Sequence, residues 1–189
     1  TEGNAWHYTW SVFHDVDGLK EAMGGNDSFT AMLDSVFVVP PIYDDSYYGF
    51  RIHEITEMQV ADMGNYAHGN QPAQHMIYLY NWAGEPQKTR KWVKEVMDRL
   101  YSAAPDGYCG DEDNGQTSAW YVFSALGFYP VCPGSGEYAV GAPLFENAVI
   151  NLENGKNVRI KADDSCGKDI LFIKHDDLIK GTRLGLKTK

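Results

Sequence analysis

The sequence lacks two features that would assign it to a large class of proteins. It has no surplus of positive charge, because 16 lysines and arginines face 26 aspartates and glutamates, for a formal net charge of −10. A nucleic-acid-binding domain normally carries a basic face, so we expect no nucleic-acid partner. The sequence also lacks any apolar run of about 18 residues, so we expect no membrane-spanning helix.

Cysteine is scarce as well. Cys109, Cys132 and Cys166 form an odd set, which argues against a disulfide framework and leaves open one disulfide with a free thiol, or none. Their spacing contains neither a CxxC pair nor the Cys/His pattern of a zinc site. A phosphate-binding loop, a nucleotide-binding glycine fingerprint and a GxSxG nucleophile elbow are missing too.

The sequence does contain enough apolar residues for a core. Its 189 residues suit one domain or a domain with an appendage, and the 43% of hydrophobic residues indicate a globular protein. Aromatic residues reach 13%, which fits either a surface for sugar-like ligands or an aromatic core. The chain opens at Thr1 without an initiator methionine or a leader, so we expect a piece of a larger protein.

Two kinds of pattern divide the chain. Apolar residues first recur at helical spacing between loops rich in glycine and proline. We expect helices over about 16–23, 26–37, 51–66, 73–82, 88–101 and 116–126. From residue 138 onward the runs alternate or are β-branched, and Asn154-Gly155 between two of them predicts a hairpin. This order favours half of an (α/α) toroid with an appended β element; a compact helical domain with a β-sheet is the alternative.

The most informative segment covers residues 105–116. Four acids lie between glycines just before a predicted helix: Asp106, Asp111, Glu112 and Asp113. Glycines permit backbone turns that would aim carboxylates into a cleft, and a helix N-terminus stabilises negative charge. A catalytic acid cluster and an ordinary acidic helix cap explain this spacing equally well.

Three shorter segments carry further candidates. Glu2 precedes Trp6 and other aromatic residues, and packing against aromatic rings can raise the pKa of a carboxyl group, which a general acid requires; a frayed terminus is the alternative. His53, Glu54 and Glu57 fall within about one helical turn, but no second histidine completes an HExxH zinc motif. Asn70 and Gln71, in a loop, offer the amide oxygens that suit sugars and Ca²⁺.

The segments together resemble the exo-acting α-mannosidases of glycoside hydrolase family 92. The resemblance covers roughly residues 1–180 and rests on the order of several motifs. They are Glu2-Gly-Asn-Ala-Trp6, Phe13-His-Asp-Val-Asp-Gly-Leu19, Gly69-Asn-Gln-Pro72, Cys109-Gly-Asp-Glu-Asp-Asn-Gly-Gln116, Gly127-Phe-Tyr-Pro130 and Gly141-Ala-Pro-Leu144.

The resemblance implies a mainly α fold with a β tail. Residues 1–130 would form the second half of an (α/α)6 catalytic barrel, and residues 131–189 a C-terminal β-rich segment. It also implies an N-terminal half of the same enzyme as a partner. The implied reaction is the inverting hydrolysis of terminal α-linked mannose, assisted by Ca²⁺ on the sugar's O2 and O3.

The resemblance also implies roles for particular residues. Glu2 stands at the family's general-acid position, and Asp111 and Asp113 stand at the general-base pair, of which Asp113 is favoured to activate water. The expected substrate contacts are Trp6, His53, Glu54, Asn70 and Gln71. The expected calcium ligands are Asn70, Gln71 and Glu57. A mannose-containing glycan such as an N-glycan is the expected partner, and the expected location is secreted or periplasmic; a non-catalytic mannoside-binding fragment is the alternative.

Overall fold

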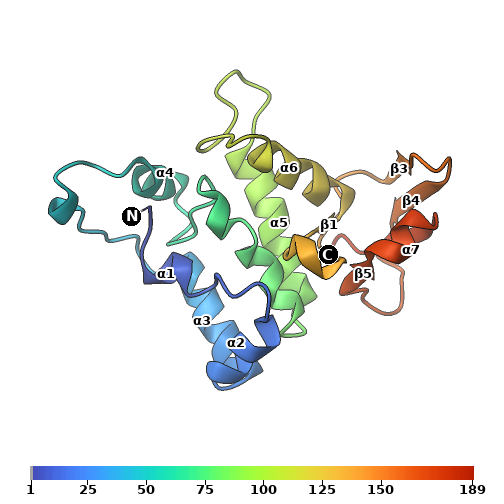
Figure 1. Ribbon diagram of the computed structural model, residues 1–189, viewed down its shortest axis with the longest axis horizontal. Helices are drawn as coiled ribbons and strands as arrows, with labels where there is room; N and C mark the ends of the chain where they lie inside the picture. Colours follow the sequence, from blue (N-terminus) through green and yellow to red (C-terminus); the bar gives the residue numbers. More distant parts are fainter. Residues whose placement is uncertain (1) are drawn as a thin grey trace. The chain divides into compact units, whose positions relative to one another are not determined.

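The computed structural model describes residues 2–189, and the chain forms two compact units (Figure 1). Unit 1 holds the residues up to Met76 together with Val96–Ser118, and unit 2 holds Ile77–Glu95 and Ala119–Lys189. Every candidate site residue lies in unit 1, so this unit is the one that matters for function. Among the described residues, no helix is long and apolar enough to cross a membrane.

Unit 1 opens with three helices: α1 (Ala5–Tyr8), α2 (Val16–Ala22) and α3 (Asn26–Val38). The predicted stop after α2 is confirmed, since Gly24 and Gly25 both take positive φ angles, of 93° and 99°. The long helix α3 buries one apolar stripe and ends two residues before Pro40.

The helix predicted over 51–66 is shorter in the structure, where α4 covers His53–Ala61. It ends because Asp62 adopts a left-handed conformation with φ of 51°. The chain then turns toward α3, and the backbone N–H of Asn65 donates to the carbonyl of Val36 at 2.6 Å. The helical spacing of apolar residues therefore continues beyond Ala61 in the sequence, but no helix forms there. The backbone of this stretch instead bonds to α3.

The prediction of one continuous helix over 73–82 is wrong. This stretch forms two 3₁₀ segments, η2 (Gln71–Ala73) and η3 (Met76–Asn81), and a third, η1 (Ser46–Tyr48), precedes α4. Pro72 stands in the first turn of η2, and the backbone bonds run from residue i+3 to residue i, as from Trp82 N–H to the Leu79 carbonyl at 3.1 Å. The helices predicted over 88–101 and 116–126 are confirmed as α5 (Pro86–Leu100) and α6 (Gln116–Leu126).

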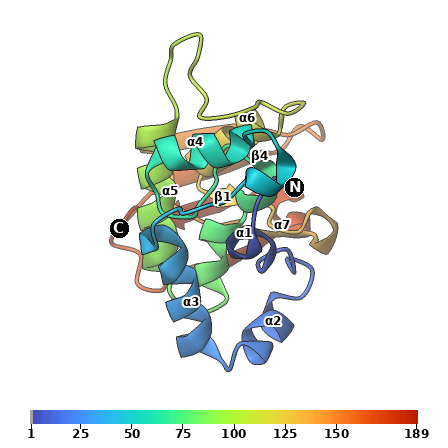
Figure 2. The same ribbon diagram turned by 90° about the vertical axis from the view of Figure 1, so that its left-hand side faces the viewer.

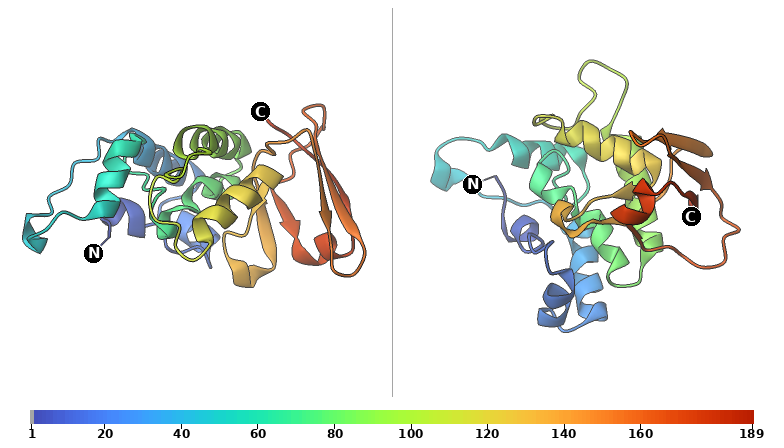
Figure 3. Two further views of the ribbon diagram at one scale, coloured as in Figure 1. Left: turned by 90° about the horizontal axis from the view of Figure 1, so that it is seen from above. Right: turned by 45° about the vertical axis from the view of Figure 1, so that its right-hand side comes forward.

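Unit 2 contains two three-stranded sheets (Figure 3). The first is antiparallel with order β1 (Phe128–Tyr129), β2 (Glu137–Val140), β5 (Phe172–Lys174). The second has order β3 (Asn147–Asn151), β4 (Asn157–Ala162), β6 (Arg183–Leu186), with a parallel β4/β6 pair. Short elements η4 (Pro133–Ser135) and α7 (His175–Ile179) lie between strands.

The predicted hairpin and β region are confirmed. Asn151 pairs with Asn157 across the turn, and Gly155 takes the positive φ of 78° that the turn requires. Side chains from both sheets and α7 form one core, made of Phe128, Val140, Val158, Ile160, Ile173, Leu178 and Leu186. The chain is thus helical at first and carries small sheets toward its end.

Candidate active site

The first two turns of α4 carry a cluster of charged side chains. His53 Nδ1 lies 3.0 Å from Glu57 Oε1, and His53 Nε2 lies 3.4 Å from Glu54 Oε1. The hydrogen bond from Glu57 raises the pKa of His53, and the charges of Glu54 and Asp111 act in the same direction. The helix therefore presents one imidazole between two carboxylates, with a third carboxylate from a distant loop nearby.

Glu57 has one oxygen without a protein partner. Its Oε2 atom is buried and accepts no hydrogen bond. Burial raises the pKa of Glu57, which His53 opposes and Asp111 reinforces. Two glycines line the oxygen, because a Cβ atom added to Gly69 would lie 3.0 Å from Oε2 and one added to Gly110 would lie 2.7 Å from it. The backbones of two loops thus form a cradle around this oxygen, and a side chain at either glycine would fill it.

This cradle fits a hard cation. A buried carboxylate oxygen with no donor costs about 1–3 kcal/mol or more, so a positively charged partner is expected. Ca²⁺ takes backbone and amide oxygens besides carboxylates, and the Gly69 carbonyl oxygen would lie 2.8 Å from the Cβ added to Gly110. Residues 2–189 contain no group of three or more His, Cys, Asp or Glu side chains placed to hold a metal, so backbone and amide oxygens would have to complete such a site.

Gln71 and Asn70 stand beside this cradle. The Gln71 side-chain nitrogen donates to the carbonyl of Asp111 at 2.9 Å, which leaves its Oε1 to accept from a sugar hydroxyl or to bind a cation. Asn70 precedes it in the same loop and is 6% exposed. The predicted amide segment therefore touches the predicted acidic segment directly.

The backbone of Asp111 is anchored from two sides. Its carbonyl accepts from Gln71 and from the Thr117 hydroxyl, both at 2.9 Å. Thr117 is fully buried, and its hydroxyl oxygen accepts from Gln74 Nε2 at 3.1 Å. The Asp111 side chain itself remains exposed. Such an arrangement fixes the chain while leaving the carboxylate open to solvent or ligand.

Glu112 caps helix α6. From the sequence, any of the four acids could have had this role. Its carboxylate accepts from the Gly115 N–H at 2.6 Å and from the Ser118 hydroxyl at 2.6 Å, at the start of α6. These bonds hold the pKa of Glu112 below its usual range, the Ser118 bond most strongly. In the described residues, no hydrogen bond or ion pair engages the exposed carboxylates of Asp111 and Asp113. Asp113 has a left-handed φ of 53°, an uncommon conformation for an aspartate.

A buried polar network lies behind this loop. The Tyr101 hydroxyl donates to the Thr117 carbonyl at 3.2 Å, so its oxygen accepts from His68 Nε2–H at 2.8 Å. His68 Nδ1 then accepts from the Tyr66 hydroxyl at 2.7 Å. Burial lowers the pKa of His68 to about 3, which keeps the imidazole neutral and preserves this tautomer. No sequence pattern predicts this network, since its members are scattered over three segments.

The N-terminal helix α1 contacts α4 through a buried side chain; Figure 2 labels both helices. His7 is buried, its Nδ1 accepts from the Asn4 N–H at 3.0 Å, and its Nε2 lies 3.2 Å from the Met58 sulfur. Burial raises the pKa of Tyr8 most, and the charges of Glu2 and then Glu54 raise it further.

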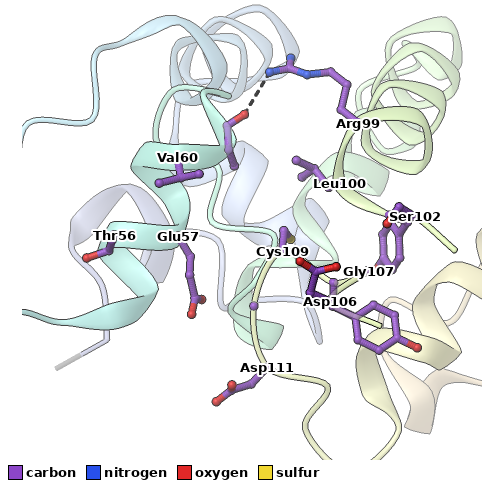
Figure 4. Close-up of a pocket in the computed structure, with 14 residues that line it drawn as sticks. Thr56, Glu57, Val60, Arg99, Leu100, Ser102, Asp106, Gly107, Cys109 and Asp111 are labelled. Carbon is purple, nitrogen blue, oxygen red and sulfur yellow. Dashed lines mark hydrogen bonds between the residues drawn. The ribbon is translucent and has the colours of Figure 1, made fainter. Parts of the chain in front are cut away.

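Unit 1 also contains a cavity of about 710 Å³ beside this cluster (Figure 4). Glu57 and Asp111 are among the residues that line it. Its other walls come from α4, the end of α5 and residues 106–110. The volume falls in the range of small-molecule sites, about 300–1,000 Å³.

The structure thus brings most predicted site residues together. His53, Glu54, Glu57, Gln71 and Asp111 interact, and the charge of Glu2 acts on Tyr8. Trp6, on α1, and Asp113, in the loop, enter none of the contacts above. All three cysteines are free.

Comparisons with known proteins agree on one family. The family model for the glycosyl hydrolase family 92 catalytic domain matches residues 1–184. The solved structure of a family 92 inverting mannosidase from Bacteroides thetaiotaomicron is 52% identical, covers 99% of this chain and 27% of its own, and has a TM-score of 0.79. A family 92 α-mannosidase from the same species, in complex with mannoimidazole, is 35% identical, with coverages of 100% and 26% and a TM-score of 0.81.

A more distant relative is an uncharacterized secreted glycosidase from Arthroderma benhamiae. It is 25% identical over 145 residues, which are 77% of this chain and 16% of the relative. The chain therefore spans little more than a quarter of the solved relatives, at 27% and 26%, and less of this one.

Proposed function

The chain belongs to glycosyl hydrolase family 92, and on this premise we propose that it supplies catalytic carboxylates to an α-mannosidase that removes terminal α-linked mannose from glycans. The observation that carries the proposal is the 52% identity, over 99% of the chain, to a protein named as an inverting mannosidase. Because the chain spans 27% of that relative, we propose that it works as the C-terminal catalytic portion of a longer enzyme.

We propose a matching architecture. Residues 1–130 would form the second half of an (α/α)6 toroid and residues 131–189 its C-terminal β-rich segment. The N-terminal portion of the enzyme would complete both the toroid and the sugar site. The order of elements supports this division, because the long helices end at Leu126 and the strands begin at Phe128; the two compact units divide the chain differently, since residues 77–95 and 119–130 belong to unit 2.

Glu2 is the proposed general acid. In this role it donates a proton to the oxygen that leaves with the released sugar. Its support is that its charge acts on the Tyr8 hydroxyl, as the charge of Glu54 also does. The capping box of Asn4 and the buried His7 hold the segment that carries it.

Asp113 is the proposed general base, with Asp111 beside it. An inverting hydrolase holds its acid and base roughly 6.5–9.5 Å apart, so that a water fits between the base and C1. The base must be ionised and free of protein partners to take the proton of that water. Glu112 takes the capping bonds of α6, and in the part of the chain that the structure describes neither aspartate carboxylate has a protein partner.

His53, Glu54, Trp6, Asn70 and Gln71 are the proposed mannose contacts. Glu57, Asn70 and Gln71 are the residues that would hold Ca²⁺, and the cradle around Glu57 Oε2 is the supporting observation. Bound there, the cation would supply positive charge to the sugar's O2 and O3.

We propose a secreted or periplasmic location and a role in N-glycan degradation. The location is supported by the Arthroderma benhamiae relative, whose name describes it as secreted. The substrate is supported by the mannosidase names of the solved relatives.

The test is hydrolysis of an α-linked mannobiose by the full-length enzyme, followed by proton NMR. Inversion predicts that β-mannose appears first, and EDTA should abolish the reaction. Asp113→Asn should reduce kcat by about 10²–10⁴-fold while calorimetry still detects mannoimidazole binding. An α-mannose first product contradicts the inverting mechanism, and EDTA-resistant hydrolysis contradicts the cation's role. Binding without any hydrolysis by the wild type favours the mannoside-binding alternative.

A further inference from the structure

Two loops that carry different parts of the proposed machinery are bonded directly to each other. We call residues 69–71 the amide loop and residues 109–113 the base loop. The side-chain nitrogen of Gln71, in the amide loop, donates to the carbonyl of Asp111, in the base loop, at 2.9 Å. A second bond runs the other way, from the Gln116 side-chain nitrogen to the Gln71 carbonyl at 3.5 Å. The two loops therefore move together or lose these bonds.

The Thr117 hydroxyl holds the same point of the base loop from behind. Thr117 lies in the first turn of α6, is fully buried, and donates to the Asp111 carbonyl at 2.9 Å. Its hydroxyl oxygen accepts from Gln74 Nε2 at 3.1 Å, so its one proton is available for that carbonyl. The Asp111 carbonyl thus uses both of its lone pairs, one on α6 and one on the amide loop.

The other end of the Gln71 amide has no protein partner. Among the described residues, no hydrogen-bond donor reaches its Oε1 atom, whereas its Nε2 atom is held by the Asp111 carbonyl. An amide group is planar, so its oxygen and its nitrogen cannot turn independently. A ligand bound at Oε1 therefore fixes the direction in which Nε2 donates, and with it the position of the Asp111 backbone.

The unpartnered oxygen of Glu57 lies where the same two loops meet. Gly69 belongs to the amide loop and Gly110 to the base loop, and Cβ atoms added to them would lie 3.0 Å and 2.7 Å from Glu57 Oε2. Ca²⁺ needs about six to eight oxygen ligands, more than one carboxylate supplies. A cation held by Glu57 would therefore lie against both loops and would favour the arrangement that brings their oxygens toward it.

We propose that Gln71 and Thr117 are positioning residues that couple cation binding to the placement of the base loop. The inference rests on the proposed function, because it needs a cation at Glu57 and Gln71 and a general base at Asp113. With the cation bound, Gln71 holds the Asp111 carbonyl from one side and Thr117 holds it from the other. Asp113, two residues further on, is then kept in one position for the activation of water.

Coupling of this kind acts equally in both directions. If cation binding orders the base loop, a loosened base loop must weaken cation binding by the same factor. Thr117 allows this consequence to be tested, since it is not a proposed cation ligand and contacts the base loop through the Asp111 carbonyl. A loss of Ca²⁺ affinity on removal of its hydroxyl would have to pass through the base loop.

A purely structural role for the Thr117 hydroxyl is the rival explanation. Removing a buried hydrogen bond lowers stability wherever it lies. Thr89 provides a matched control, because it is also 0% exposed and its hydroxyl donates to Asn81 Oδ1 at 2.8 Å, within unit 2. Thr89→Val removes the same chemical group without touching either loop.

The first measurement is calorimetric Ca²⁺ affinity of the full-length enzyme, together with hydrolysis of an α-linked mannobiose. Thr117→Val should weaken Ca²⁺ binding by about fivefold or more, the lower end of typical coupling between two sites. It should also lower kcat with little change in KM, because the base loop and not the sugar contacts is displaced. Thr117→Ser, which keeps the hydroxyl, should retain both properties, and Thr89→Val should change neither.

The second measurement is hydrogen exchange of residues 105–116 with and without saturating Ca²⁺. In the wild type, Ca²⁺ should slow exchange of this segment, since local opening becomes less favourable. Gln71→Glu keeps an oxygen for the cation but has no N–H for the Asp111 carbonyl. In this variant Ca²⁺ should still bind but should no longer slow the exchange.

Three results would overturn the inference. The first is unchanged Ca²⁺ affinity in Thr117→Val. The second is a loss in Thr89→Val as large as that in Thr117→Val, which would mean that both hydroxyls only support the fold. The third is equal slowing of exchange by Ca²⁺ in Gln71→Glu and the wild type, a comparison that stands even if Thr117→Val does not fold. A wild-type enzyme that binds no Ca²⁺ would refute the cation's place in the proposed function as well.

Discussion

Gly69 and Gly110 approach so closely that a Cβ atom on Gly110 would lie 2.6 Å from the Cα of Gly69. They belong to different loops, one before η2 and one before α6. Their contact brings the segment of Asp111 against Glu57. Neither has the positive φ that favours glycine, so lack of space alone makes glycine necessary here.

Gly110→Ala should therefore force the two loops apart. We expect a destabilisation of about 1–3 kcal/mol, as for overpacking in a core, and loss of most mannosidase activity. Thermal unfolding and kcat/KM measure the two effects. Gly134→Ala is the matched control, since nothing lies within 4 Å of its added Cβ. An active, stable Gly110→Ala enzyme would show that the loops do not need this contact.

Glu57→Gln tests the cation cradle without relying on catalysis. At a Ca²⁺ concentration about 100-fold above the dissociation constant, linkage stabilises the wild type by about 2.7 kcal/mol. Glu57→Gln should lose most of this gain, because it removes the negative charge of the buried carboxylate. The exposed α2 residue Glu21 offers a control, Glu21→Gln. Equal calcium-induced shifts in melting temperature for all three proteins would argue against Glu57 as a ligand.

The buried network predicts a contrast between two tyrosines. Tyr101→Phe and Tyr66→Phe each remove one hydroxyl bonded to His68, so each should cost about 1–3 kcal/mol of stability. Tyr101 bonds directly to the Thr117 carbonyl, next to the hydroxyl that holds the Asp111 backbone, whereas Tyr66 reaches Thr117 only through Gln74. Tyr101→Phe should therefore lower kcat with little change in KM, and Tyr66→Phe should leave kcat near wild type. Parallel kcat losses in both variants would reduce the network to a structural role.

His68 predicts how stability depends on pH. Its pKa is about 3 when folded and about 6.5 when unfolded, so the unfolded chain binds the extra proton between these values. The stability that its neutral form provides is complete above pH 6.5 and is lost as pH falls, by up to about 1.4 kcal/mol per unit. Buried His7 and His75 have lowered pKa values through burial and act with the same sign. Urea unfolding at pH 7 and pH 5 should show a smaller change in His68→Gln than in the wild type; an equal change would contradict the assignment.

The elements that were predicted correctly from the sequence are determined by residues close to one another in the chain. Helix α6 and the hairpin at Gly155 follow from spacing and turn chemistry within a few residues. The end of α4 at Asp62 does not, because the backbone of Asn65 pairs with Val36, far away in the chain. Periodicity cannot report such competition.

The same limit applies to the site. Motif order placed Glu54, Glu57 and Asp111 among the candidates, and the structure brings them together. Motif order could not assign the capping role to Glu112 alone, since four acids shared one stretch of sequence. The roles of His68 and Tyr101 depend on contacts between residues 33 positions apart, and neither residue type signals burial by itself.

The proposed roles of Glu2 and Asp113 are distinguished most sharply by changing the leaving group of the substrate. Fluoride departs from C1 without being protonated, whereas a sugar oxygen needs a proton from the acid. Glu2→Gln should therefore lower kcat for mannobiose by about 10²–10⁴-fold but affect α-mannosyl fluoride little. Asp113→Asn should impair both substrates, because each requires an activated water. Should Asp113→Asn spare the fluoride while Glu2→Gln abolishes both, the two roles are reversed. Equal losses on both substrates in both variants would mean that neither residue is the acid, since only an acid distinguishes the two leaving groups.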